Sequence, residues 1–149
     1  MRQAATRPLD STLDFMRLLW SVENRLQSTS KRMEMQLGIT GPQRLVLKVV
    51  AQSPGISPKD VADVVRLHPS TITGILQRLT AKGLIARTTD PADSRRARLV
   101  VRSAARRYTR LSRGTIEFAV ARALGRLNPP AVRAARRVLA EIAAALESA

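Results

Sequence analysis

Hydrogen-bonding side chains cluster between positions 70 and 78, where short or planar polar groups alternate with apolar ones. The polar or open positions are Ser70, Thr71, Thr73, Gly74, Gln77 and Arg78. A glutamine such as Gln77 can pair with adenine through two hydrogen bonds in the major groove of DNA. The sequence therefore indicates that this segment reads DNA bases. The alternative is an ordinary solvated helix face, because such short patterns also occur by chance.

Charged side chains gather a few residues further on, in a predicted hairpin. They are Asp93, Arg95, Arg96 and Arg98. A narrow minor groove attracts arginine through its concentrated negative potential, and we assign that role first to Arg95. We expect Asp93 to orient the Arg95 guanidinium, and Arg98 to contact DNA phosphates. The alternative is that these arginines only keep the hairpin soluble.

Two short helices are predicted to position the base-reading segment. The first begins at Ser57-Pro58, a capping hydroxyl followed by proline at the first helical position, where no N–H is needed. The next begins at His68-Pro69, since proline restricts the preceding residue to extended backbone and so ends the first helix. The predicted apolar face of the first helix is Val61, Ala62, Val64 and Val65.

The second of these helices is followed by a hairpin pattern. Its apolar residues recur at i, i+3, i+4 and i+7, which places them on one buried face, and they are Ile72, Ile75, Leu76 and Leu79. Gly83 follows, where helices commonly end in a left-handed residue. Residues 84–88 and 98–101 are predicted strands, and residues 90–96 are predicted to form the turn between them, because they begin with residue types typical of turns. Helix, turn, helix and hairpin in this order predict a winged helix-turn-helix.

Helices are also predicted before this unit. A cap at Asp10 or Ser11 begins a helix that ends near Gly38, and Thr40-Gly41-Pro42 begins the next. The apolar residues of the first are Leu13, Phe15, Leu18, Leu19, Val22, Leu26 and Met33. The inward residues of the second are Leu45, Val46, Val49 and Val50.

Two further helices are predicted after the hairpin. Ser103 caps a long one through Leu124, and Asn128-Pro129 begins the last. The long helix would carry a basic stripe of Arg102, Arg106, Arg110 and Arg113. The last helix has a coiled-coil-like seam of Val132, Ala135, Leu139, Ile142 and Leu146.

The terminal helices carry more apolar surface than one thin domain buries. We therefore predict a homodimer formed across a two-fold axis by Leu13 and the seam of the last helix. The alternative is that these helices fold back within one chain. The predicted fold is mainly α with a small β-hairpin wing. Its parts are a disordered arm (1–9), a dimerisation helix (10–38), a winged helix-turn-helix domain (39–102) and C-terminal dimerisation helices (103–149).

Composition favours a polyanionic partner and disfavours several other functions. The formal net charge is +15. The chain has no cysteine and one histidine, so we expect no disulfide, thiol sensor, metal site or cofactor. No Ser–His–acid set, paired carboxylates or glycine-rich phosphate loop stands out, so we do not expect an enzyme. Without an apolar run of membrane-spanning length or a signal peptide, we expect a cytoplasmic protein.

The chain resembles the MarR family of bacterial transcriptional regulators over almost its whole length. The matching motifs are Ile39-Thr40 with Gln43 and Leu47, Ser57-Pro58 with Val61-Ala62, Ser70-Thr71-Ile72-Thr73, Lys82-Gly83-Leu84-Ile85 and Asp90-Pro91-Ala92-Asp93-Ser94-Arg95. The resemblance implies a homodimer held by its terminal helices, a recognition helix starting near Pro69 and a minor-groove role for Arg95. It also implies repression that a small ligand relieves. Gly74 departs from the family, which often has a larger basic residue there, and Arg106 replaces a frequent glycine.

The resemblance further implies a ligand cleft between the dimerisation helices and the DNA-binding lobes, suited to aromatic or phenolic acids. Met16, Trp20 and Asn24 lie on one predicted helix face and would line it, with Arg17 or Arg44 as counter-charge. The alternative is that this stripe belongs to the core.

The sequence thus predicts a DNA-binding transcriptional regulator, a ligand-responsive repressor that binds a pseudo-palindromic operator as a homodimer. An architectural protein that binds any duplex is the main alternative. A membrane-surface role for the last helix is another, because Arg133, Arg136 and Arg137 oppose its apolar seam.

Overall fold

Most helices begin at a residue whose side chain caps them, as the sequence predicts. The computed structural model describes residues 9–149, so the arm predicted over 1–9 lies, apart from Leu9, outside the described residues. The chain forms two units, one ending at Arg110 and one spanning Leu111–Ala149. The first contains α1 (Ser11–Leu37), α2 (Gly41–Gln52), α3 (Pro58–Val65), α4 (Pro69–Ala81), β1 (Ile85–Asp90), β2 (Asp93–Val101), a 3-10 turn (Ser103–Ala105) and α5 (Arg106–Thr109). The second contains α6 (Ile116–Leu124) and α7 (Pro129–Glu147).

The caps of the first unit fix where its helices start and stop. The Asp10 carboxylate accepts a hydrogen bond from the Leu13 N–H at 2.9 Å, and α1 ends at Gly38, whose φ of 70° is left-handed. Thr40 and Gln43 form a capping box at the start of α2, each side chain accepting from the other residue's backbone N–H. These local bonds satisfy N–H groups that the first turn of a helix leaves without partners.

The core of the first unit lies where α2, α3 and α4 meet the inner ends of the two strands. Its buried residues include Ile39, Val46, Leu47, Val50, Val61, Ala62, Ile72, Ile75, Leu76, Leu79, Ile85 and Leu99. The predicted inward positions of Leu45 and Val64 are wrong, because these side chains are 49% and 62% exposed. The buried face of α2 contains Val46 and Val50, and that of α3 contains Val61. Leu45 and Val64 therefore lie outside the faces that point into the core.

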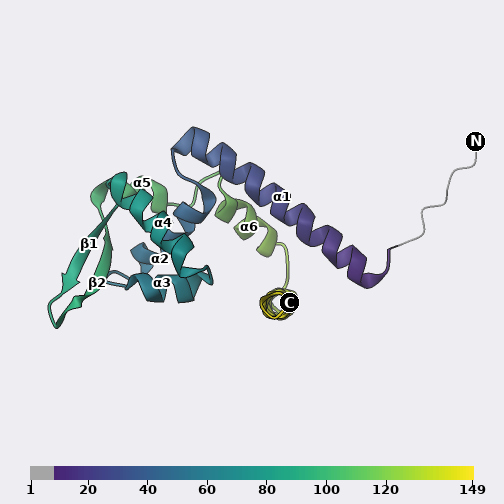
Figure 1. Ribbon diagram of the computed structural model, residues 1–149. Coiled ribbons are helices and arrows are strands. Elements are labelled where there is room, and N and C mark those ends of the chain that lie inside the picture. Colours follow the sequence, from purple (N-terminus) through teal and green to yellow (C-terminus); the bar gives the residue numbers. More distant parts are fainter. Residues whose placement is uncertain (1–8) are drawn as a thin grey trace, which may run out of the picture. The chain divides into compact units, whose positions relative to one another are not determined.

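The two strands form an antiparallel hairpin that projects from the helices (Figure 1). Ile85 pairs with Val101 at its base, and Asp90 pairs with Asp93 at its tip, with an irregularity between Thr89 and Asp90. The turn predicted over residues 90–96 is therefore shorter than expected, because the strands reach to Asp90 and Asp93. Ile56 bridges to Leu99, which attaches the hairpin to the α2–α3 connection.

The single long helix predicted after the hairpin is wrong. Ser103 makes no side-chain cap, α5 ends at Thr109, and Arg110 is extended with ψ of 143°. The reason lies in α2: the Arg44 guanidinium donates to the Arg110 carbonyl oxygen at 2.5 Å, and the Lys48 ammonium donates to the Thr109 carbonyl oxygen at 3.0 Å. These bonds satisfy the carbonyls at the end of α5 without a further helical turn. The predicted basic stripe of Arg102, Arg106, Arg110 and Arg113 therefore does not lie on one helix.

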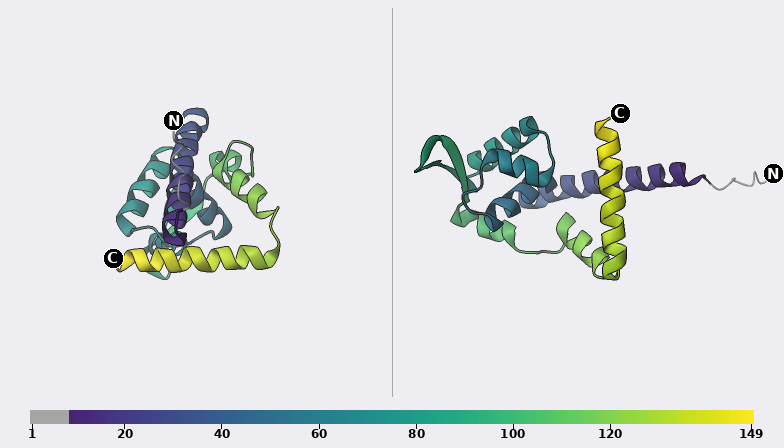
Figure 2. Two further views of the ribbon diagram at one scale, coloured as in Figure 1. Left: turned by 90° about the vertical axis from the view of Figure 1, so that its right-hand side faces the viewer. Right: turned by 90° about the horizontal axis from the view of Figure 1, so that it is seen from below.

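The second unit consists of two separate helices. Gly114 has a left-handed φ of 82°, and the Thr115 hydroxyl then caps α6 by accepting from the Phe118 N–H at 3.4 Å. Asn128 caps α7 by accepting from the Ala131 N–H at 2.9 Å, and α7 continues without a break to Glu147 (Figure 2). The predicted architecture, mainly α with a β-hairpin wing, is confirmed.

Large apolar side chains remain exposed on the helices predicted to form a dimer. On α1 these are Leu13, Phe15, Leu18, Trp20, Val22 and Leu26, and on α7 they are Val138, Leu139 and Leu146. Among the apolar residues predicted for α1, Met33 alone is buried by the part of the chain that the structure describes. In the described part of the chain, no helix is long and apolar enough to cross a membrane.

Candidate nucleic-acid interface

The outward face of α4 has the composition that the sequence predicts. Ile72, Ile75, Leu76 and Leu79 are buried. The polar residues on the other side are exposed, and they are Ser70, Thr71, Thr73, Gln77 and Arg78. Gly74 is half-buried on this helix, and a Cβ atom built there would meet nothing within 4 Å. The glycine therefore leaves an open position in which a partner can approach the backbone.

The start of α4 is fixed by its own side chains. His68 caps the helix, its Nδ1 accepting from the Ser70 N–H at 3.2 Å and lying 2.7 Å from the Ser70 hydroxyl oxygen. The Thr73 hydroxyl donates to the Pro69 carbonyl oxygen at 3.0 Å. Within the described residues, the side chains of Gln77 and Arg78 have no hydrogen-bonding partner, so both are available to an external one.

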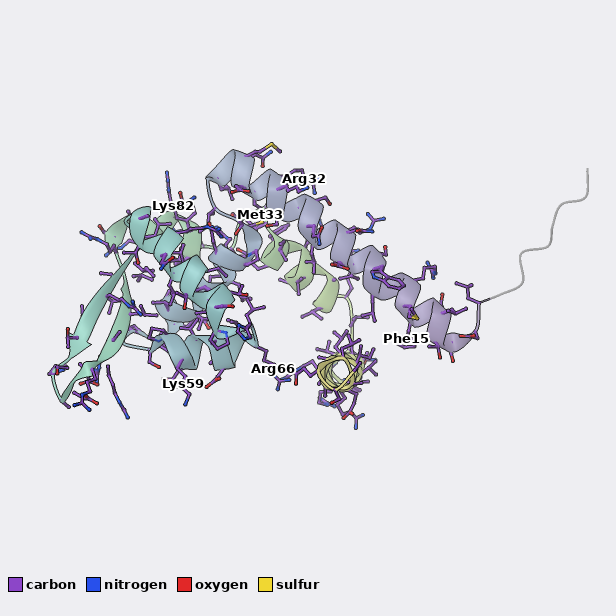
Figure 3. The ribbon with its side chains drawn as sticks, viewed as in Figure 1. Phe15, Arg32, Met33, Lys59, Arg66 and Lys82 are labelled. Carbon is purple, nitrogen blue, oxygen red and sulfur yellow. The ribbon has the colours of Figure 1, made fainter. Side chains whose placement is uncertain are left out.

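The turn between α3 and α4 is held by an unusual backbone conformation. Arg66 ends α3 with φ of 53°, a left-handed backbone angle that residues other than glycine rarely adopt. Figure 3 shows Arg66 and Lys59 at one edge of the first unit and Lys82, which ends α4, at the opposite edge. Lys59 and Arg66 therefore lie away from the C-terminal end of α4.

The tip of the hairpin is organised by Asp90. Its Oδ1 accepts from the Ala92 N–H at 2.9 Å, and its Oδ2 accepts from the Arg98 guanidinium at 2.9 Å. The Ala92 N–H, followed by the Arg98 guanidinium, lowers the pKa of the Asp90 carboxyl below its usual value. Asp90 is therefore ionised at neutral pH and links the two strands at the tip.

Asp93 does not orient the Arg95 guanidinium, so that prediction is wrong. Its Oδ1 accepts from the backbone N–H of Arg95 at 3.0 Å, and its Oδ2 lies 3.6 Å from the Arg96 Nε. A short aspartate side chain reaches the N–H two residues further on more easily than it reaches a long side chain. Asp93 thus fixes the Arg95 backbone, and in the described chain no carboxylate pairs with the Arg95 guanidinium.

A basic hollow of about 640 Å³ lies between the start of α3 and the hairpin. Its cationic lining residues are Lys59, Arg87, Arg95, Arg96 and Arg98, and its carboxylates are Asp60 and Asp90. Five cations against two carboxylates favour an anionic partner such as a phosphate chain. Lys59 and Arg87 were not predicted as site residues, although Lys59 directly follows the Ser57-Pro58 helix start and Arg87 lies within a predicted strand.

Both predicted counter-charges of the ligand cleft on α1 have partners within the chain. Arg17 pairs with Asp14 at 2.7 Å, Met16 and Trp20 are exposed, and the Trp20 side chain is 56% accessible. Arg44 is buried, with 1% of its surface exposed, and donates to the Arg110 carbonyl oxygen. Arg44 is therefore not available as the counter-charge of that cleft.

Comparison with known proteins shows which family the chain resembles. The family described as MarR matches residues 37–96, from the end of α1 into the hairpin. The HTH-type transcriptional repressor Rv2887 of Mycobacterium tuberculosis is 27% identical over 106 residues, which are 71% of this chain and 76% of the relative. Along this segment the chain is similar to MarR proteins.

Solved structures of transcriptional regulators have the same fold as this chain. The transcriptional regulator SlyA matches with a TM-score of 0.73 and 20% identity, covering 91% of this chain and 95% of that one. MepR of S. aureus, in its DNA complex, matches with a TM-score of 0.71 and 17% identity, covering 88% and 97%. Rv2887 in complex with p-aminosalicylic acid matches with a TM-score of 0.55 and 25% identity, covering 92% and 99%. The family is one of transcriptional regulators rather than of enzymes.

Proposed function

We propose that this chain is a MarR repressor that binds a pseudo-palindromic operator in double-stranded DNA as a homodimer and responds to a small organic effector. The observation that carries the proposal is the position of an open polar helix face on the same unit as a basic hairpin. The side chains of α4 that point outward are hydrogen-bonding groups, and the neighbouring hollow carries an excess of three cations. This combination fits DNA, whose grooves present base edges between two rows of phosphates.

We assign base reading to the first three turns of α4. Ser70, Thr71, Thr73, Gln77 and Arg78 would face the major groove, with Gly74 allowing close approach. Gln77 is the candidate for a bidentate contact to adenine, since it is exposed and without an internal partner among the described residues.

We assign the hairpin to the neighbouring DNA backbone and minor groove. Arg95 would enter the groove, because its backbone is held by Asp93 while its guanidinium is left without a carboxylate in the described chain. Arg96 and Arg98 would contact phosphates, and Lys59 and Arg87 would add to that contact from the other wall of the hollow.

The dimer is supported by the exposed apolar surface of α1 and α7. We propose that residues 39–102 form the DNA-binding domain and that 10–38 and 103–149 supply the dimer contacts, among them Leu13, Val132, Leu139, Ile142 and Leu146. Two such domains related by a two-fold axis would read half-sites about one helical turn, roughly 34–36 Å, apart.

An effector is supported by one relative. Rv2887 was crystallised with p-aminosalicylic acid, and we propose that a similar aromatic acid acts on this chain. Trp20, the one tryptophan, lies exposed on α1 with Met16 and Arg17. Quenching of its fluorescence by p-aminosalicylic acid tests whether that surface binds the acid.

The deciding experiment is selection of bound sequences from a random duplex pool with the full-length protein at near-physiological salt. We expect enrichment of a pseudo-palindrome that binds roughly a thousandfold or more tighter than random duplex. Strong binding without enrichment would overturn the proposal and favour an architectural protein, for which sequence makes no difference.

A further inference from the structure

The last helix, α7, runs without a break (Figure 2) and has two opposite faces, of which the proposed function uses one. Its apolar side carries Leu139 and Leu146, with 56% and 69% of their surfaces exposed, and is the proposed dimer contact. Arg133, Arg136 and Arg137 lie together on the other side, since steps of three and four residues return to the same face of a helix. All three are exposed. The dimer therefore leaves these three residues, the basic face of α7, without a role.

The basic face of α7 is not neutralised within residues 9–149. Its three arginines form no ion pair and no side-chain hydrogen bond there, although Glu141 follows Arg137 by one turn. Positive charges three and four residues apart repel each other and destabilise a helix. The free chain therefore carries a repulsion on α7 that a bound anion would relieve.

The sequence around the basic face adds positive charge and no negative charge. Between Glu117 and Glu141 the chain has no aspartate or glutamate. The charged residues of this stretch are Arg122, Arg126, Arg133, Arg136 and Arg137. Arginine without lysine favours phosphate as the partner, because the planar guanidinium matches two phosphate oxygens at once. The expected ligand is therefore a polyanion that carries phosphate groups.

Two phosphate surfaces fit a basic amphipathic helix, DNA and an anionic membrane. A helix that lies on a membrane buries its apolar face at the level of the lipid chains. In the proposed dimer, however, the apolar side of α7 is covered by the partner subunit and is not available to lipid. The basic face alone remains, and arginines contact the backbone of DNA without inserting into it. The dimer therefore favours DNA over a membrane.

We propose that Arg133, Arg136 and Arg137 bind the phosphate backbone of double-stranded DNA, independently of sequence, beyond the part that α4 and the wing contact. The proposal goes beyond the proposed function, in which the first unit alone touches DNA. It rests on that function only for the dimer that covers the apolar side of α7. The phosphates can belong to the flank of the same duplex or to a second duplex, and their chemistry is the same in both.

The test is the salt dependence of binding of the full-length protein to a long random duplex. One variant combines Arg133→Gln, Arg136→Gln and Arg137→Gln, because glutamine keeps the helix propensity and removes the charge. We expect the slope of log affinity against log salt concentration to flatten by about 0.9 for each lost phosphate contact. At near-physiological salt, affinity for this duplex should fall roughly tenfold. Affinity for a short duplex that holds only the selected operator should stay as in the wild type.

The matched control removes three exposed cations of α1 by Arg25→Gln, Lys31→Gln and Arg32→Gln, so that the net charge falls equally. It should keep the wild-type salt dependence. Sedimentation equilibrium checks that both variants are dimeric. If the variant of α7 fails to fold or to dimerise, Arg137→Gln alone decides, with the loss of one contact.

Two further measurements identify the source of the phosphates. Capture of a labelled random duplex by the complex with the short operator indicates a second duplex, and tighter binding to an operator with longer flanks indicates the same one. Either result supports the proposal if the variant of α7 loses it.

Unchanged salt dependence in the variant of α7, or equal losses in that variant and the α1 control, would overturn the proposal. Loss of binding to phosphatidylserine vesicles with unchanged DNA binding would also overturn it, by assigning the basic face to a membrane. The random duplex needs no operator, so a failure to select one would overturn the proposed function and leave this inference to its own test.

Discussion

The Arg98 guanidinium meets the Asp90 carboxylate across the hairpin, with Nη2 and Oδ2 2.9 Å apart. The same carboxylate accepts from the Ala92 N–H, so one side chain fixes the turn and the other strand together. A Cβ atom at Gly55 would lie 3.8 Å from Arg98 Nη1, which means that the arginine also passes close to the α2–α3 connection. Arg98 is therefore part of the support of the wing as well as a candidate phosphate contact.

Arg98→Ala should loosen the wing and weaken all DNA binding. The Ala92 amide should exchange faster with solvent, because Asp90 loses the partner that holds it in place. Operator and random duplex should lose affinity alike, and the salt dependence should flatten by about one unit for the lost phosphate contact. Hydrogen exchange and binding at several salt concentrations measure the two effects. Arg96→Ala is the control: it removes an arginine of the same strand but not the Asp90 pair, and should leave Ala92 protected.

The wing should loosen at acid pH. The pKa of Asp90 is lowered from 3.8 by the Ala92 N–H and by Arg98, so the folded hairpin binds a proton less readily than the unfolded chain does. The contacts of the ionised Asp90 carboxylate therefore stabilise the hairpin fully at a pH above the ordinary pKa of an aspartate. This stabilisation is lost as the pH falls through the lowered pKa of Asp90. Carboxyl NMR of Asp90 and exchange of the Ala92 amide should report the same transition, which Asp90→Asn should abolish. A midpoint at or above 3.8 would contradict the assignment.

Arg95→Ala should weaken operator binding by about 1–3 kcal/mol and relax the preference for A·T-rich flanks. Arg95 leaves its guanidinium free of carboxylates in the described chain, whereas Arg96 lies close to Asp93. Arg96→Ala is therefore expected to have the smaller effect on sequence preference. Competition binding with operators of altered flanks measures both variants. Equal losses on operator and random duplex for Arg95→Ala would contradict a minor-groove role.

The helix starts and the buried face of α4 could be predicted because they depend on local chemistry. Ser57-Pro58 and Asn128-Pro129 each combine a capping side chain with a proline at the first helical position, and both begin helices as expected. The buried face of α4 follows from the period of 3.6 residues, which places every third or fourth residue on one side of a helix.

The break after α5 and the burial of Arg44 could not be predicted, because both depend on contacts between distant residues. The Arg44 guanidinium meets the Arg110 carbonyl oxygen 66 positions along the chain, and the Lys48 ammonium meets that of Thr109. The sequence pattern of this segment is compatible with one continuous helix. It does not show that distant side chains donate hydrogen bonds to the carbonyl oxygens at the end of α5. The length of the wing turn was missed for a related reason, since strand pairing at the tip depends on Asp90, Ala92 and Arg98 acting together.

Leu139→Glu should weaken the dimer and, with it, operator binding. Leu139 lies on α7 with 56% of its surface exposed, and a charge there would have to be buried in the proposed interface. Sedimentation equilibrium of the variant should show dissociation at concentrations where the wild type is dimeric. Ala134→Glu adds the same charge at another exposed position of α7 and should leave the dimer intact. A stable dimer of Leu139→Glu would place the interface elsewhere.

Gly74→Ala should separate the stability of α4 from its ability to bind DNA. Alanine favours a helix over glycine by about 1 kcal/mol, and its Cβ would meet nothing within 4 Å, so the free energy of unfolding should rise. The added methyl group would occupy the open position of the outward face, and operator affinity should fall. Thr80→Ala, an exposed change nearer the end of the same helix, should leave operator affinity unchanged. If Gly74→Ala is more stable and still binds the operator as the wild type does, then DNA does not approach the backbone at this position, and base reading rests on the flanking side chains alone.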